Sequence, residues 1–162
     1  MLKRSMLALP ATLCLAACTS GPPPTPARQP LTVVTSTAND LVGGARVTVE
    51  GRDFDTSKGI YVAYCVEPES GYPPTPCGGG VDNTGDSGAS AWISSNPPPY
   101  GKDLVEPYGP DGTFTTAITV SPRIGSIDCR RQVCGIATRA DHTRSADRSQ
   151  DTFTPVTFKE NK

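Results

Sequence analysis

The sequence lacks both a long apolar run and an excess of positive charge. Its most apolar stretch, residues 6–17, reads M-L-A-L-P-A-T-L-C-L-A-A, far shorter than the roughly 20 residues that a membrane-spanning helix needs. Without Lys3 and Arg4, which precede this stretch, 13 of the 15 basic residues remain, against 16 acidic ones. The remaining chain is mildly acidic, with a net charge near −3. This balance argues against direct nucleic-acid binding, which normally requires a basic face.

The sequence contains a single histidine, which limits the catalytic and metal-binding chemistry that the protein can perform. The one histidine, His142, lies in R-A-D-H-T-R beside Asp141. A Ser–His–Asp relay needs a carboxylate behind the ring and a serine in front of it, whereas the side chains of neighbouring residues diverge. Metal binding by His142 with Asp141 and Asp147 has no spacing signature. We expect a solvated loop histidine in a protein that is not an enzyme and has no catalytic residue, metal or cofactor. A hydrolase that uses His142 is the alternative.

Cysteines with the spacing of a zinc or redox site are also missing. Zinc ligands usually come in pairs separated by two to four residues, but eleven residues separate Cys65 from Cys77. Catalytic redox pairs usually have two intervening residues, whereas four lie between Cys129 and Cys134. An even number of cysteines in an exported domain instead predicts two disulfides, and three pairings are open at this point.

Export is predicted by the first residues. The basic start M-L-K-R and the short apolar stretch after it are typical of a secretory leader. The leader ends in L-A-A-C (15–18), which resembles a bacterial lipobox and predicts a signal peptide of residues 1–17 with lipid attached to Cys18. We therefore expect a lipoprotein that its lipid holds on the outer face of the bacterial cell membrane. The alternative is an ordinary signal peptide with a cysteine near its cleavage site.

A proline-rich segment follows the expected lipid site. Residues 19–30 read T-S-G-P-P-P-T-P-A-R-Q-P, which favours extended polyproline II backbone rising about 3.1 Å per residue. Residues 18–30 are thus interpreted as a lipidated cysteine with a semi-rigid tether of roughly 35 Å. Residues 31–162 fit one folded domain.

Alternation of apolar and polar residues dominates this domain and predicts an all-β fold. The short strands are broken by Gly, Pro, Asn and Asp, as in an immunoglobulin-like antiparallel sandwich of about seven strands. Pro155 cannot donate to a sheet ladder, so the last strand should be an edge strand or carry a bulge. The expected strands are 31–37, 45–51, 59–65, 112–120, 132–138 and 152–158.

The segment 66–111 is rich in proline and glycine and carries Tyr72, Trp92, Tyr100 and Tyr108. One interpretation is loop structure in which these rings pack on prolines and Trp92 faces the core from a short strand. The other is a rigid, semi-apolar binding surface, because Tyr and Trp offer contact area at low entropy cost.

Four segments together resemble a known family. They are L-V-G-G-A-R-V-T-V-E-G (41–51), Y-V-A-Y-C (61–65), D-G-T-F-T-T-A-I-T-V (111–120) and, most specifically, I-D-C-R-R-Q-V-C-G (127–135). The chain resembles the neocarzinostatin family over roughly residues 31–160; these are secreted actinobacterial apoproteins that sequester enediyne chromophores. In that family the last motif closes a tight disulfide loop.

The resemblance implies a Greek-key sandwich with the local disulfides Cys65–Cys77 and Cys129–Cys134. It also implies a cleft on one sheet that holds an apolar polycyclic ligand between aromatic side chains. Three departures concern this cleft: Glu67 stands where tryptophan is frequent, residues 121–126 form a bare turn in place of a long hairpin, and Arg139 replaces a small polar residue. Gly135 and Ala137 are small, as a cleft floor requires.

Six arginines between residues 123 and 148 are close in sequence and partly balanced by aspartates. They are interpreted as a mixed-charge loop rim, or alternatively as a basic edge that meets an anionic ligand. We predict a membrane-anchored, monomeric binding module for a small apolar or anionic ligand or a surface protein. The alternative is a chromophore-carrying antibiotic apoprotein whose chromophore damages DNA. The expected ligand-binding residues are Gly135, Ala137, Arg139, Trp92, Tyr72 and Tyr100.

Overall fold

The computed structural model describes residues 31–79 and 87–160. Cys18, the predicted leader and the predicted tether lie outside the described residues. Within the described ranges, no helix has the length and apolar character that crossing a membrane requires.

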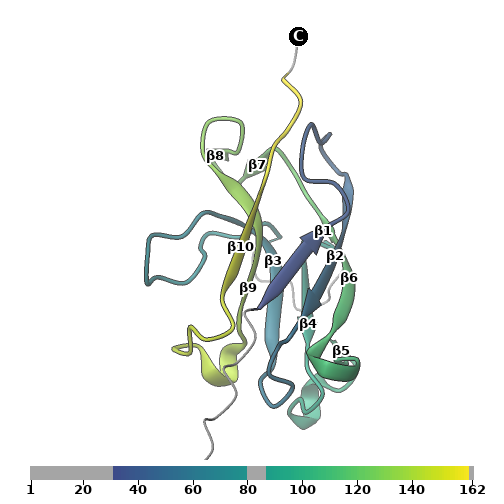
Figure 1. The fold of residues 1–162 in the computed structure, drawn as a ribbon. Helices are drawn as coiled ribbons and strands as arrows, with labels where there is room; N and C mark the ends of the chain where they lie inside the picture. The colour runs from purple at the N-terminus through teal and green to yellow at the C-terminus, as the bar shows by residue number, and fades with distance from the viewer. Residues whose placement is uncertain (1–30, 80–86, 161–162) are drawn as a thin grey trace, which may run out of the picture.

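Two sheets form the sandwich, and their strands are antiparallel except for the short β5 (Figure 1). The smaller sheet has the order β1-β2-β6, with β1 at Thr32–Thr35, β2 at Arg46–Arg52 and β6 at Phe114–Thr119. The larger sheet has the order β10-β9-β3-β4-β5. Its strands are β10 at Thr152–Val156, β9 at Cys134–Ala140, β3 at Ile60–Val66, β4 at Ser90–Ile93 and β5 at Val105–Glu106.

The predicted all-β sandwich is confirmed. The seven strands of four or more residues in the described chain comprise the six expected ones and β4, which contains Trp92. Three two-residue strands add to them: β5, which pairs in parallel with β4, and the hairpin of β7 (Arg123–Ile124) and β8 (Ile127–Asp128). Short 3-10 turns occupy the connections at η1 (Pro99–Gly101), η2 (Pro110–Gly112) and η3 (His142–Arg144).

Strand β2 shows why the alternating sequence forms a half-buried strand. Val47 and Val49 are 1% and 0% exposed, whereas Arg46, Thr48 and Glu50 are exposed. Successive side chains of a strand point to opposite faces, so every second residue reaches the core between the sheets. Burying a valine completely stabilises the fold by about 1.5–3 kcal/mol.

Strand β3 is buried on both faces because it is central in the larger sheet, between β9 and β4. Ile60, Val62 and Tyr64 belong to the main core, and the alternate residues Ala63 and Cys65 belong to a second, smaller apolar cluster. The second cluster therefore lies on the outer face of the larger sheet, away from the smaller sheet.

Strand β10 is an edge strand, as Pro155 predicts. Its one strand partner in the described chain is β9, with Pro155 opposite Gly135. An edge position leaves one side of the strand without a ladder, so the missing proline N–H is tolerated there.

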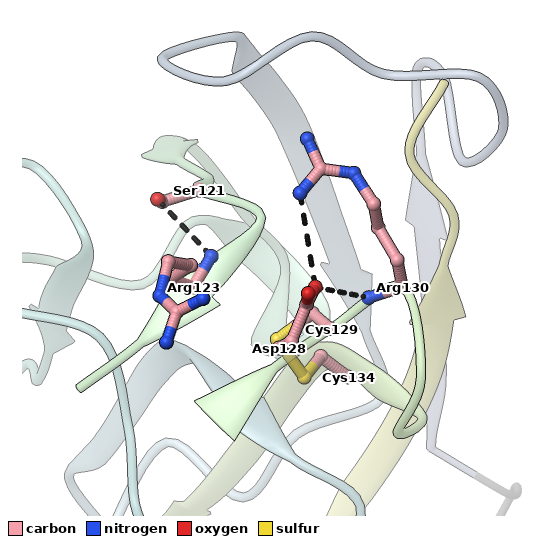
Figure 2. The surroundings of a disulfide bond; sticks show 6 residues. All are labelled: Ser121, Arg123, Asp128, Cys129, Arg130 and Cys134. Atoms are coloured by element: carbon pink, nitrogen blue, oxygen red, sulfur yellow. Dashed lines mark hydrogen bonds and ion pairs between the residues drawn. A yellow bond between two sulfur atoms is a disulfide. The ribbon is translucent and has the colours of Figure 1, made fainter. Parts of the chain in front are cut away.

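Both predicted disulfides form. Figure 2 shows Cys129 and Cys134 closing the turn after β8, with their Cα atoms 5.5 Å apart. The turn is also held by Asp128, whose Oδ1 accepts from the Arg130 backbone N–H at 3.1 Å and lies 3.7 Å from the Arg130 guanidinium. This disulfide is buried and part of the main core.

The second disulfide, Cys65–Cys77, folds the segment 66–79 back onto the end of β3. Two backbone hydrogen bonds support it: the Val66 N–H donates to Pro76 O at 3.0 Å, and the Gly78 N–H donates to Tyr64 O at 2.7 Å. The segment is therefore fixed at its base by one covalent bond and two hydrogen bonds.

Within residues 121–126, expected as a bare turn, residues 123–126 form the first strand and the turn of the short β7–β8 hairpin. Gly125 takes the positive φ of 57° that its turn requires, and the Arg123 guanidinium donates to Ser126 O at 3.2 Å. Ile124 is buried and anchors the hairpin to the core, which the residue pattern alone did not predict.

Candidate functional site

The outer face of the larger sheet gathers the predicted floor residues. In the β3–β9 register, Tyr61 lies opposite Arg139, Ala63 opposite Ala137, and Cys65 opposite Gly135. Residues directly opposite each other in an antiparallel pair share a face. Gly135, Ala137 and Arg139 therefore form a row on the outer face.

The two small residues of this row lie beneath a ring from the neighbouring strand. Phe153 of β10 lies opposite Ala137. A Cβ atom added to Gly135 would meet the Phe153 ring at 2.8 Å and the Thr154 carbonyl oxygen at 2.3 Å. Gly135 and Ala137 thus make room for Phe153 of the same chain, and Phe153 presents the apolar surface of the floor. Sequence reasoning missed it, although the alternation in T-F-T-P-V places it on this face.

A pocket of about 340 Å³ opens beside Phe153. One wall is the disulfide-held segment, through residues 68–72 and Pro74, and the other is formed by Arg148 and residues 151–153. Tyr72, an expected ligand-binding residue, is in the first wall and is 66% exposed. The pocket is thus lined by two aromatic rings and two prolines as well as by charged groups.

Arg148 and Asp151 form an ion pair in the second wall. Arg148 Nη1 lies 3.0 Å from Asp151 Oδ2, and Arg148 Nη2 donates to Ser145 O at 2.6 Å. Burial raises the pKa of Asp151, and the nearby Arg148 and Arg139 oppose that rise. Within the described chain, Oδ1 of Asp151 and Nη1 of Arg148 are buried without a hydrogen-bond partner.

A compact aromatic cluster lies on the same face, around Trp92. The ring centre of Trp92 lies 5.8 Å from that of Tyr61, 6.5 Å from Tyr100 and 5.1 Å from His142. Trp92 is 8% exposed, and a Cβ on Gly101 would meet its ring at 2.6 Å. Trp92 thus packs among residues of its own chain, as the loop interpretation of segment 66–111 expects, but on the outer face of the sheet.

The Asp141 carboxylate holds the Trp92 indole in place by a hydrogen bond. Its Oδ2 accepts from Trp92 Nε1 at 3.0 Å, and its Oδ1 accepts from the Thr143 backbone N–H at 2.9 Å and the Thr143 hydroxyl at 2.6 Å. Asp141 is 2% exposed, and a Cβ on Gly59 would lie 2.0 Å from Oδ2. Glycine at position 59 is therefore required for Asp141 to reach the indole.

His142 is exposed, as expected, but both of its ring nitrogens are engaged. The Tyr61 hydroxyl lies 2.5 Å from Nδ1 and the Tyr100 hydroxyl 2.5 Å from Nε2. A tyrosine hydroxyl can donate or accept, so each tyrosine can pair with its ring nitrogen in either tautomer of the imidazole. The expectation of a merely solvated loop histidine is wrong, because His142 bridges η1 and β3.

The cluster does not form a catalytic relay. The Asp141 carboxylate binds Trp92 and Thr143, and His142 binds two tyrosines. Burial, followed by the Asp141 charge and Tyr100, raises the pKa of Tyr61, so its hydroxyl stays protonated. Among the residues with described positions, no group of three or more His, Cys, Asp and Glu could hold a metal ion.

Five of the six predicted ligand-binding residues thus fall into three places. Trp92 and Tyr100 belong to the aromatic cluster, Tyr72 to the pocket wall, and Gly135 and Ala137 to the floor beneath Phe153. Arg139 lies between the cluster and the pocket: its guanidinium is 5.9 Å from the Tyr61 ring centre, and its charge acts on Asp151.

Tyr108, the fourth aromatic residue of the 66–111 segment, belongs to the main core. It packs 6.5 Å from Phe114, and its hydroxyl donates to Lys58 O at 3.1 Å. It therefore has no part in the outer face.

Comparison with solved structures finds macromomycin, an apoprotein of the neocarzinostatin family. The TM-score is 0.50 at 15% sequence identity, and the alignment covers 79% of this chain and 98% of macromomycin. The two proteins share a fold. No family model and no curated protein matches the sequence. At this identity the similarity extends to the sandwich, and the residues of the outer face must be interpreted from their own geometry.

Proposed function

We propose that this protein is a non-catalytic binding domain that holds a small ligand, or a segment of a partner protein, on the outer face of its larger sheet. The observation that carries the proposal is the pocket of about 340 Å³ between the disulfide-held segment and Phe153. Ligand sites are typically concave, apolar and largely preformed. Here the Cys65–Cys77 bond and the β9–β10 ladder hold the two walls before any ligand arrives.

Absence of catalysis is part of the same proposal. The best acid–base candidates of the outer face are Asp141, which accepts a hydrogen bond from Trp92, and His142, which is hydrogen-bonded to Tyr100. Among the described residues, neither is paired with a serine, threonine or cysteine in the way that a nucleophile requires. The Thr143 hydroxyl donates to Asp141, and the Asp141 carboxylate caps η3 by accepting from the Thr143 backbone N–H. These interactions support a structural role for both residues.

Attachment to the outer face of the bacterial membrane through Cys18 completes the proposal. It rests on the lipobox-like L-A-A-C and the proline-rich residues 19–30. A domain on such a tether would present its pocket away from the bilayer surface. We propose that the protein acts as a monomer, with the lipid as its one membrane contact.

Native mass spectrometry of protein from its own host tests these points together. We expect a chain that begins at lipid-modified Cys18, contains two disulfides and releases a small molecule on denaturation. An unmodified Cys18 would contradict the anchor. The absence of any saturable ligand, in this experiment and in titrations of the purified protein, would contradict the binding function.

A further inference from the structure

Two tyrosines of the chain are equally exposed, but their hydroxyl groups have different surroundings. Tyr72 and Tyr100 are both 66% exposed. The Tyr100 hydroxyl lies 2.5 Å from Nε2 of His142, whereas no residue of the described chain forms a hydrogen bond with the Tyr72 hydroxyl. One exposed phenol is therefore in contact with a base, and the other serves as a reference for it.

The contact with a base matters for oxidation. When a phenol loses one electron, its hydroxyl becomes a strong acid, so the electron is lost more readily if a neighbouring base accepts the proton in the same step. A neutral imidazole is such a base, and a positioned base typically accelerates a reaction by about 10²–10⁴-fold. His142 is in hydrogen-bond contact with the hydroxyl whose proton Tyr100 would lose on oxidation.

Tyr61 can support the tautomer of His142 that this step needs. Nε2 must carry no hydrogen in order to accept from Tyr100, so the ring hydrogen has to be on Nδ1. The Tyr61 hydroxyl lies 2.5 Å from Nδ1 and can accept that hydrogen. Both contacts are also compatible with the imidazolium that forms, because both of its nitrogens donate and each tyrosine oxygen can accept.

The Asp141 carboxylate favours the positive charge that His142 would acquire. Asp141 is 2% exposed, and none of the ion pairs among the described residues includes it. Burial and, next, the Asp141 charge raise the pKa of Tyr61, whereas Arg139 lowers it. The negative charge of Asp141 therefore acts on the hydroxyl that contacts His142, and at this position it outweighs the opposing charge of Arg139.

Packing holds the exposed Tyr100 ring beside His142. The ring centre of Trp92 lies 6.5 Å from that of Tyr100 and 5.1 Å from that of His142. Gly101, the next residue of η1, lies so close to the indole that a Cβ there would approach it to 2.6 Å. The turn is therefore anchored on Trp92, and this packing supports the contact between Tyr100 and His142.

We propose that Tyr100 is the site at which this protein reacts with one-electron oxidants, such as peroxyl radicals or the high-valent haem of a peroxidase, with His142 as the proton acceptor. The oxidant gains one electron from the phenol, and the phenolic proton moves to Nε2 of His142. A neutral tyrosyl radical and an imidazolium remain, and the imidazolium then releases its extra proton to solvent. This modification site goes beyond the proposed binding function and does not depend on it.

Flash photolysis of the purified full chain tests the proposal. A laser flash and a cobalt(III) quencher convert tris(bipyridine)ruthenium(II) into the ruthenium(III) oxidant, and the recovery of the ruthenium(II) absorbance gives the rate constant of protein oxidation. Tyr100→Phe should lower this rate constant about tenfold or more, because the phenol assisted by a base is lost. Tyr72→Phe is the matched control: it removes an equally exposed phenol and should leave the rate constant nearly unchanged.

His142→Gln separates the base from the hydrogen bond. A glutamine side chain can accept a hydrogen bond from Tyr100, but it is too weak a base to take the proton, so the rate constant should fall nearly to that of Tyr100→Phe. Oxidation of the wild-type protein should also be slower in D₂O, because a proton moves in the same step. The isotope effect requires no substitution, so it tests the role of His142 even where His142→Gln disturbs η1.

Spin trapping locates the radical. With 2-methyl-2-nitrosopropane present during the flash, mass spectrometry of peptides should find the adduct mainly at Tyr100. Equal or greater yield at Tyr72, or equal slowing by Tyr72→Phe and Tyr100→Phe, would overturn the oxidation site. A wild-type rate constant in folded His142→Gln, or no isotope effect in the wild-type protein, would overturn the role of His142. Ligand titrations test the binding function separately, so failure of one proposal is distinguishable from failure of the other.

Discussion

The indole Nε1 of Trp92 donates a hydrogen bond to the buried Oδ2 of Asp141 at 3.0 Å. This bond joins β4 to the start of η3, positions that are 49 residues apart in the sequence. It fixes the ring around which Tyr61, Tyr100 and His142 gather. The Asp141 carboxylate therefore holds in place the ring on which this aromatic cluster packs.

Removing that carboxylate should destabilise the protein. In Asp141→Ala, the Trp92 N–H loses its acceptor while remaining largely buried, which typically costs about 1–3 kcal/mol. Urea unfolding at neutral pH measures the loss. Trp92→Phe and the double variant complete the cycle, and we expect a coupling of about 0.5 kcal/mol or more. Additive effects of the two substitutions would show that the bond carries no stability of its own.

His142→Ala should loosen η1 more than it destabilises the whole domain. The substitution removes both hydroxyl contacts of the imidazole, but His142 is exposed, so we expect a loss of about 1 kcal/mol or less in unfolding free energy. Hydrogen exchange should accelerate around the Gly101 and Leu104 N–H groups, which bond within the turn. His142→Gln is the control that retains a polar side chain. Unchanged exchange in His142→Ala would contradict the bridging role.

The stability contributions of Asp147 and Asp151 should change with pH in opposite directions. Hydrogen bonds from Lys58 and Ser149 lower the pKa of Asp147, with Lys58 Nζ at 2.7 Å from Oδ2. A folded-state pKa below the unfolded value gives stability that is present above the unfolded pKa and lost as pH falls toward the folded one. The stability advantage of wild type over Asp147→Asn, about 0.2–1 kcal/mol for an accessible ion pair, should therefore shrink between pH 7 and pH 2.5.

Asp151 should show the opposite dependence of stability on pH and therefore serves as an internal control. Burial raises its folded-state pKa, so its charged form is disfavoured in the fold at neutral pH and the penalty disappears as pH falls through that pKa. The stability of wild type relative to Asp151→Asn should consequently increase on acidification. Parallel trends for the two variants in urea titrations would contradict the assigned pKa directions.

A methyl group at position 135 should not be tolerated. In Gly135→Ala, the new Cβ would lie 2.3 Å from the Thr154 carbonyl oxygen, a backbone atom that cannot rotate away. We expect a loss of about 1–3 kcal/mol from the forced shift of β10, measured by thermal and urea unfolding. Gly135→Ala with Phe153→Leu should recover only part of the loss. Full recovery would show that the ring alone, and not the backbone, requires glycine.

The two disulfides should contribute differently. For closed loops with sequence separations of 5 and 12 residues, the chain-entropy relation gives about 2 and 3 kcal/mol. We expect the Cys65→Ala/Cys77→Ala variant to lose more stability and also to lose ligand binding at the pocket, because that bond holds a pocket wall. The Cys129→Ala/Cys134→Ala variant should lose stability and retain binding once folded. The reverse pattern would contradict the assignment of the pocket walls.

Local features of the sequence predicted much of the scaffold. Alternation identifies the buried face of β2, because side-chain direction in a strand has a period of two residues. Pro155 marks an edge strand because it lacks an N–H. The resemblance around residues 127–135 gave both disulfide pairings, which the cysteine count alone left open.

Fewer residues of the candidate site than of the scaffold could be predicted from the sequence. Tyr72, Gly135 and Ala137 were identified as site residues, but Phe153, Glu69, Asp151 and the His142 bridge were not. Phe153 could have been predicted from the sequence. Alternation places it on the face of β10 opposite to the buried Val156, and its partner across the strand pair, Ala137, is small. The Arg148–Asp151 pair has no such signal within its loop.

The amino-acid sequence by itself determined which residues can alternate into a core, where strands end and how many cysteines can pair. Those properties depend on the backbone and side chain of each residue and its immediate neighbours. Only the tertiary structure decided that Phe153 covers Gly135, that Asp141 binds Trp92 and that segment 66–79 faces residues 148–153. The physical reason is that strand periodicity fixes the face on which a side chain lies, whereas the neighbour it meets depends on strand order and register, which many distant contacts set together.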